Sequence, residues 1–186
     1  GEISLKNIAE AAGMLQHCDF DIQMTLEAGV GGARADMLVT LPGGGMIPVD
    51  AKAPLTSYIK AQEAKDPEEA KKALKQLTKD VKKHIDDLVQ RDYAQYAERG
   101  ADFTVMYIPS EPVLAATFEA APKLQEYAFA KRILITTPVT LLALLRTVAV
   151  YWRHEAIMDN ASEIAENAQE LYSRVTTFAE HLASMG

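Results

Sequence analysis

Two aspartates and a lysine are spaced as a divalent-metal site would need them. Asp36 lies in one strand-like run, and Asp50 and Lys52 lie in the next with one residue between them. Hard cations such as Mg²⁺ prefer oxygen ligands, and they usually bind one or two carboxylates together with waters and phosphate oxygens. A lysine beside such carboxylates can position an attacking water or neutralise charge that develops at phosphorus. These residue types therefore favour phosphodiester hydrolysis.

The elements that must position these residues predict an α/β fold with a mixed central sheet. The strand-like runs are Phe20–Glu27, Ala33–Leu41, Met46–Ala53, Asp102–Pro109 and Ile133–Thr137. The first three are joined by short glycine-rich segments and should form an antiparallel meander, whereas the last two follow helices and should be reached by crossovers. Predicted helices are Glu2–Ala12, Pro67–Glu98 with a break near Asp92, Pro138 to about Met158, and Ala161–Met185.

The register of the second hairpin decides whether the three residues meet. A turn centred on Gly43 places Asp36 opposite Asp50, with Lys52 on the same face because side chains alternate along a strand. The other face is then apolar and should be core; it carries Met37, Val39, Leu41, Ile47, Val49, Ala51 and Ala53. Two facing carboxylates roughly 5 Å apart at Cβ repel each other, so we expect a cation between them.

An ordinary alternative is that these acids lie on a solvent-facing side of the sheet and Lys52 simply pairs with them. The spacing of the two aspartates and the lysine occurs often in unrelated sequences, so by itself it does not separate the two interpretations.

Several further segments resemble the RmuC family of bacterial DNA recombination proteins. They are Gly1-Glu2, Arg34-Ala35-Asp36, Leu41-Pro42, Val49-Asp50-Ala51-Lys52, Lys83-His84-Ile85, Tyr107-Ile108-Pro109-Ser110-Glu111-Pro112, Thr140-Leu141-Leu142-Ala143, Leu145-Arg146-Thr147 and Trp152-Arg153. The resemblance covers essentially the whole chain. One departure is Ala35, where the family motif usually has proline, and this residue is not a ligand.

The resemblance implies a restriction-endonuclease-like fold of the PD-(D/E)xK kind and a Mg²⁺- or Mn²⁺-dependent nuclease acting in DNA recombination, where it limits rearrangement at repeats. It implies that Asp36, Asp50 and Glu2 hold the metal, that the Ala51 carbonyl contributes, and that Lys52 is catalytic. It also implies a longer parent protein, often with an upstream coiled coil and an inner-membrane anchor.

Other charged residues are weaker candidates for the same chemistry. A lysine stripe could follow a DNA backbone, although a solvated helix face is the more common explanation; it consists of Lys71, Lys75, Lys79 and Lys82. Arg146 and Arg153, seven residues apart, could also meet phosphate. His84 lies in an apolar seam and is more often a core residue than a base, and Glu111 is either a helix-start acid or a supporting acid of the site.

Composition limits the remaining possibilities. The 186 residues, with 48% hydrophobic side chains, favour one domain over residues 1–186, and the start at Gly1 indicates a fragment of a longer protein. No apolar run is long enough to span a membrane, and one cysteine fits a reducing, cytoplasmic compartment. The net charge of −7 disfavours indiscriminate nucleic-acid binding.

Two functions remain open at this stage. The first is a metal-dependent DNA nuclease. The second is a non-catalytic DNA- or protein-binding scaffold, which the charge and the last helix favour. That helix has the heptad-like spacing of a coiled coil and could join a partner or a second copy, although packing on the preceding helix is the expected arrangement. RNA as the substrate also stays open.

Overall fold

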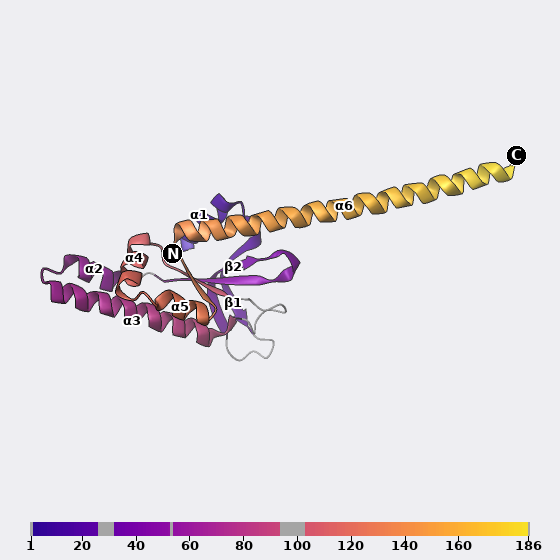
Figure 1. Cartoon of the computed structure of the whole chain (residues 1–186). Helices are drawn as coiled ribbons and strands as arrows, with labels where there is room; N and C mark the ends of the chain where they lie inside the picture. The colour runs from indigo at the N-terminus through magenta and orange to yellow at the C-terminus, as the bar shows by residue number, and fades with distance from the viewer. Residues whose placement is uncertain (1, 26–31, 53, 94–102, 186) are drawn as a thin grey trace. The chain divides into compact units, whose positions relative to one another are not determined.

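The computed structural model describes residues 2–25, 32–52, 54–93 and 103–185. Their side chains are described except at residues 2, 3, 21–25, 32, 33, 163, 165, 172 and 175–185. The chain divides into two compact units, Gly1–Ala149 and Val150–Gly186. The first contains the sheet and the helices around it, and the second consists of the remainder of the last helix (Figure 1).

A five-stranded sheet with the order β1-β2-β3-β4-β5 forms the centre of the first unit. Its first three strands form the predicted antiparallel meander, and β4 and β5 are added in parallel. The strands are β1 (Cys18–Thr25), β2 (Gly32–Thr40), β3 (Met46–Ala51), β4 (Thr104–Tyr107) and β5 (Ile133–Thr136). The predicted mixed α/β class is therefore confirmed.

Helices provide the crossovers that parallel pairing requires. Between β3 and β4 the chain forms α2 (Leu55–Glu63) and α3 (Pro67–Arg91). Of these two helices, α2 was not predicted from the sequence as a separate element. Asp92 ends α3 in the left-handed conformation, with φ of 40°, at the predicted break, and the predicted continuation to Glu98 lies outside the described residues. Between β4 and β5 lie α4 (Glu111–Ala120) and α5 (Leu124–Ala130).

Helices cover both faces of the sheet. α3 buries Leu77, Val81 and Ile85 in one apolar cluster with Leu38 of β2 and Met106 of β4. On the other side α1 (Glu2–Ala12) contacts β1 and β2, and Ser4 Oγ lies 2.7 Å from the Tyr107 hydroxyl. Coverage of both faces explains why all four residues of β4 are buried.

The predicted hairpin register is confirmed, and the alternative of a solvent-facing side of the sheet does not hold at Asp50. Met37 pairs with Val49 and Val39 pairs with Ile47, and all four side chains are buried as expected. Asp50 on the opposite face is also buried, with 5% of its surface exposed. The reason is that β4 and α3 make β3 an interior strand, which local alternation along the hairpin does not reveal.

The two predicted C-terminal helices are one helix, α6 (Pro138–Met185). The expected break near Asn160 is wrong because that segment contains neither glycine nor proline, so nothing stops the helix there. A continuous helix also rules out the expected packing of its last part against its first. None of the helices formed by the described residues has the length and apolar character that a bilayer span requires.

Candidate functional site

Asp36, Asp50 and Lys52, the predicted metal-binding and catalytic residues of the β2–β3 hairpin, line one pocket. The pocket has a volume of about 490 Å³, and its walls are Arg34, Asp36, Asp50, Ala51, Lys52, His84 and Arg91. The backbone ladder between β2 and β3 begins at Met37 and Val49, so Asp36 and Asp50 come next in the same register. The hairpin therefore brings both aspartates to one pocket, as predicted.

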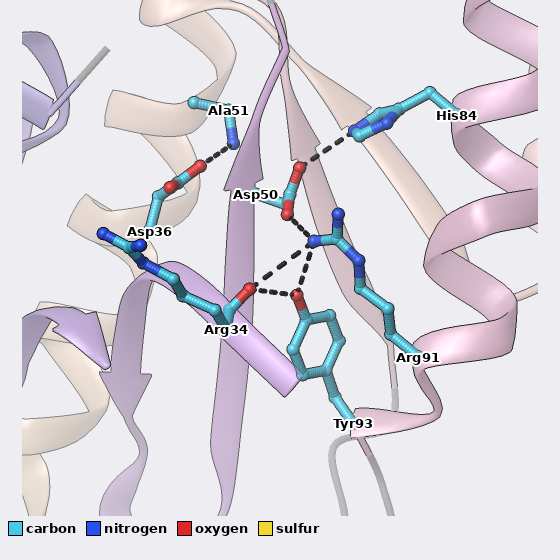
Figure 2. A network of polar contacts seen from close by, with 7 residues as sticks. All are labelled: Arg34, Asp36, Asp50, Ala51, His84, Arg91 and Tyr93. Carbon is cyan, nitrogen blue, oxygen red and sulfur yellow. Dashed lines mark hydrogen bonds and ion pairs between the residues drawn. The ribbon is translucent and has the colours of Figure 1, made fainter. Parts of the chain in front are cut away.

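Asp36 is fixed by the strand beside it. The backbone N–H of Ala51 donates to Oδ2 of Asp36 at 2.6 Å, and Figure 2 shows the carboxylate turned toward that amide. The aspartate thus accepts from β3 beyond the last backbone pair of the ladder. This hydrogen bond needs no metal, so Asp36 is in place before any ligand arrives.

Asp50 is held by two residues of α3. Nε2 of His84 lies 2.9 Å from Oδ2, and Nη1 of Arg91 donates to Oδ1 in an ion pair (Figure 2). Burial raises the pKa of the Asp50 carboxyl, but the hydrogen bond from His84 and the charge of Arg91 lower it more, so the pKa lies below its usual value. Asp50 is therefore ionised at neutral pH despite its burial.

A second set of contacts joins the end of α3 to β2. The Tyr93 hydroxyl donates to the Arg34 carbonyl oxygen at 2.7 Å, and Nη1 of Arg91 lies 3.1 Å from the Tyr93 oxygen. Burial raises the pKa of Tyr93, which keeps the hydroxyl protonated and able to donate. Tyr93 therefore joins the two elements that carry Asp36 and Arg91.

Lys52 follows the last residue of β3 and is exposed. Its backbone N–H donates to the Tyr107 carbonyl oxygen at 2.8 Å, which fixes position 52 against β4. The side chain lines the aspartate pocket and also a neighbouring pocket of about 320 Å³. The neighbouring pocket shares His84 and Lys52 with the first and adds Pro54, Thr56, Ser57, Asp80, Lys83 and Asp87.

The donor atoms suit a hard divalent cation. Within the described residues no three His, Cys, Asp or Glu side chains are grouped to hold a metal ion. Glu2 begins α1, but its side chain lies outside the described residues, so the predicted third acid is not placed. Two carboxylates are nevertheless enough for Mg²⁺, which completes its coordination with water and substrate phosphate. Asp36 and Asp50 therefore fit such an ion.

The weaker candidates lie in different places. His84 is buried and contacts Asp50, so it is both a core residue and part of the pocket. Glu111 starts α4 outside the pocket, and its Oε1 accepts from the Val139 N–H at 3.4 Å. Arg146 donates to the Ala11 carbonyl oxygen at the end of α1, and Arg153 is exposed on α6 beyond Ala149.

The lysine stripe of α3 does not form one patch at the aspartate pocket. Lys71 and Lys75 line a separate pocket near the start of α3 together with Asp66, Glu68 and Glu69. Lys79 is exposed, and Nζ of Lys82 lies 4.6 Å from the centre of the Tyr127 ring. Lys83, on the next position of the helix, is the lysine of α3 that lines the pocket adjoining the aspartates.

Sequence reasoning missed Arg91 and Tyr93 as members of the site. Arg91 follows His84 by seven residues, which is about two helical turns, so both side chains lie on the same side of α3. The seven-residue spacing between His84, a polar residue in an apolar seam, and Arg91 was the feature of the sequence that could have indicated Arg91 as a member of the site.

Comparison with known proteins gives one family. The model of the RmuC family matches residues 1–186. The DNA recombination protein RmuC homolog of Zymomonas mobilis is 37% identical over 186 residues, which cover all of this chain and 42% of that protein. The DNA recombination protein RmuC of Escherichia coli K12 is 32% identical over 188 residues, which cover all of this chain and 40% of that protein. No solved structure matches the chain.

Proposed function

The chain belongs to the RmuC family, and we propose that it carries a divalent-metal-dependent site that hydrolyses phosphodiester bonds of DNA. The observation that carries this proposal is the pocket shared by Asp36, Asp50 and Lys52 on the β2–β3 hairpin. We propose DNA as the substrate because the relatives are named DNA recombination proteins. The chain spans about two fifths of those relatives, so a role in limiting DNA rearrangement is a proposal for the larger protein.

Each residue of the pocket has a definite part in the proposed reaction. The carboxylates of Asp36 and Asp50 would hold Mg²⁺ or Mn²⁺, with Glu2 and the Ala51 carbonyl as further oxygen donors. A divalent cation supplies a Lewis acid for the phosphate and lowers the pKa of a coordinated water. Lys52, which is exposed and lines both pockets, would orient the attacking water or neutralise charge at phosphorus. The restriction-endonuclease-like fold implied by the family is part of this proposal.

The second candidate function is a non-catalytic DNA- or protein-binding scaffold. The observation that favours it is the ion pair of Asp50 with Arg91, reinforced by His84, because such a network stabilises a buried carboxylate without any metal. Both candidates place Asp50 in the same surroundings. They differ in whether a divalent cation binds there.

A Mn²⁺ titration followed by electron paramagnetic resonance separates the two candidates. We expect saturable binding of Mn²⁺ to the chain and a loss of at least about tenfold in affinity for Asp36→Asn, because one carboxylate ligand becomes a neutral amide. The asparagine oxygen can still accept from the Ala51 N–H, so the hairpin should remain intact. Equal binding by both chains, or none by either, would contradict the nuclease proposal and favour the scaffold.

Lys83 is expected to contact the DNA strand next to the aspartate pocket. Changing Lys83 to Gln should lower the dependence of DNA affinity on salt by one phosphate contact, or about 0.9 in the slope of log K against log salt. Lys75→Gln removes the same charge from the same helix but lines the remote pocket, so it is the matched control. Fluorescence anisotropy with a labelled duplex at several salt concentrations measures the slopes of Lys83→Gln and Lys75→Gln. Equal slopes for the two variants would mean that Lys83 is not part of the DNA-binding surface.

A further inference from the structure

Arg91 occupies the position on Asp50 that a bound cation would need. Its guanidinium forms an ion pair with Oδ1 of Asp50, while His84 holds Oδ2. Both oxygens of the buried carboxylate therefore already have partners, and one partner carries a full positive charge. Asp36 differs, because its described hydrogen bond comes from the neutral backbone N–H of Ala51.

The surroundings of Arg91 allow its side chain to leave Asp50 without unravelling the site. The Arg91 side chain is 37% exposed, whereas that of Asp50 is 8% exposed. The remaining hydrogen bonds of Nη1 are to neutral oxygens, those of the Tyr93 hydroxyl and the Arg34 carbonyl. Tyr93 itself donates to that carbonyl at 2.7 Å, so the link between β2 and the end of α3 persists when Arg91 turns away.

Charge explains why such a movement needs a replacement cation. A buried carboxylate that loses its charged partner is strongly disfavoured, so Arg91 holds Asp50 while no cation is bound to that carboxylate. A divalent ion on Asp50 would supply that charge and release the guanidinium into a pocket that receives phosphate. Guanidinium groups match phosphate oxygens well because their planar donors can form two parallel hydrogen bonds.

We propose that Arg91 and the divalent cation exchange at Asp50. In the metal-free protein Arg91 neutralises and positions the carboxylate. When a cation binds, Arg91 releases Asp50 and donates to a phosphate oxygen of the DNA strand, so no bond other than hydrogen bonds and ion contacts changes. Arg91 is thus a positioning residue for the metal site and a phosphate ligand in the complex. This inference rests on the proposed function.

Mn²⁺ affinity tests the exchange without any measurement of cleavage. We expect Arg91→Gln to bind Mn²⁺ about tenfold more tightly than the unaltered chain, because the competitor for Asp50 is gone. Lys52→Gln removes a positive charge from the same pocket but from a residue that does not pair with Asp50, and it should change the affinity by only about twofold. Electron paramagnetic resonance of free Mn²⁺ measures all three chains.

The outcomes separate this inference from the proposed function. Unchanged or weaker Mn²⁺ binding by Arg91→Gln, while the unaltered chain binds, would overturn the exchange and leave the metal site standing. Equal gains for Arg91→Gln and Lys52→Gln would also overturn it, because they would reflect charge alone. Absence of binding by every chain would overturn both.

DNA binding tests the second half of the exchange. The probe is a fluorescein-labelled DNA duplex, and Ca²⁺ replaces Mg²⁺ as the divalent cation. In Ca²⁺, Arg91→Gln should lower the slope of log K against log salt by about 0.9. In EDTA the substitution should leave that slope unchanged. The same decrease in both solutions would show that Arg91 contacts phosphate without exchange. If Arg91→Gln fails to fold, Arg91→Lys replaces it. Lysine keeps the positive charge but lacks the planar guanidinium that can form two parallel hydrogen bonds, so the Mn²⁺ affinity and the salt slope should both lie between those of the unaltered chain and those expected for Arg91→Gln.

Discussion

Asp50→Asn is expected to lower the rate of Mg²⁺-dependent DNA cleavage by about a thousandfold or more, which corresponds to about 4 kcal/mol of transition-state free energy. The substitution keeps the shape of the side chain and replaces its charge with a neutral amide. Asp36 and Asp50 would both coordinate the cation. Loss of the Asp50 charge therefore removes one carboxylate ligand and weakens the electrostatic attraction of the pocket for the cation. A gel assay with labelled DNA and varied Mg²⁺ measures the effect.

Lys52→Met belongs to the same prediction and isolates the chemical step. The lysine is exposed and follows β3, so its replacement should leave the fold and the binding of Mn²⁺ largely intact. Cleavage should nevertheless fall at least about a hundredfold, because one group that stabilises developing charge is removed. Loss of cleavage with retained metal binding would distinguish Lys52 from the two aspartates.

Asp66→Asn is the control for the change of charge. Asp66 caps the start of α3, where asparagine is an equally good cap, and it lines the remote pocket. Its cleavage rate should match that of the unaltered chain. If Asp50→Asn or Lys52→Met retained full activity with a normal thermal melt, the assignment of the active site would be wrong.

Leu88→Ala is expected to lower the free energy of unfolding by about 2–5 kcal/mol. Leu88 is 1% exposed and packs in the cluster beneath the sheet with Val81 and Ile85. It lies on α3 between His84 and Arg91, so the cavity would form where the helix that holds Asp50 contacts the sheet. Urea denaturation followed by circular dichroism measures the change.

Val89→Ala is the matched control on the next position of the helix. Its side chain is 39% exposed, and alanine favours a helix slightly more than valine does, so we expect a change within about 1 kcal/mol. Similar losses in both variants would mean that α3 is not anchored through Leu88. A normal Leu88→Ala protein would contradict the described core.

Sequence alone predicted the hairpin because its determinants are local. Alternating side chains and a glycine-rich turn fix which residues of β2 face which residues of β3, and the pairing of Met37 with Val49 agrees. The same locality explains what was missed. Burial of Asp50 depends on α3, which begins at Pro67, and the alternation of side chains along β3 does not indicate where that helix packs.

The candidate site was likewise predicted in part. Asp36, Asp50 and Lys52 share a pocket because they share a hairpin. Arg91 was not predicted, because its contact with Asp50 joins residues 41 positions apart through the docking of a helix on a sheet. His84 was correctly placed in the inward seam of α3, but its hydrogen bond to Asp50 depends on the same docking.

The hydrogen bond from the Ala51 amide to Asp36 has an evolutionary consequence. Its donor is a backbone group, so Asp36 can serve the hairpin with any residue other than proline at position 51. Selection for a stable hairpin would then preserve this aspartate even in lineages that no longer bind a metal. His84 and Arg91 each contact Asp50 through their side chains, and among relatives these three positions should change together. Retention of Asp36 alone would therefore not mark a metal site, and correlated change at residues 50 and 91 would mark the lineages that keep the contact between β3 and α3.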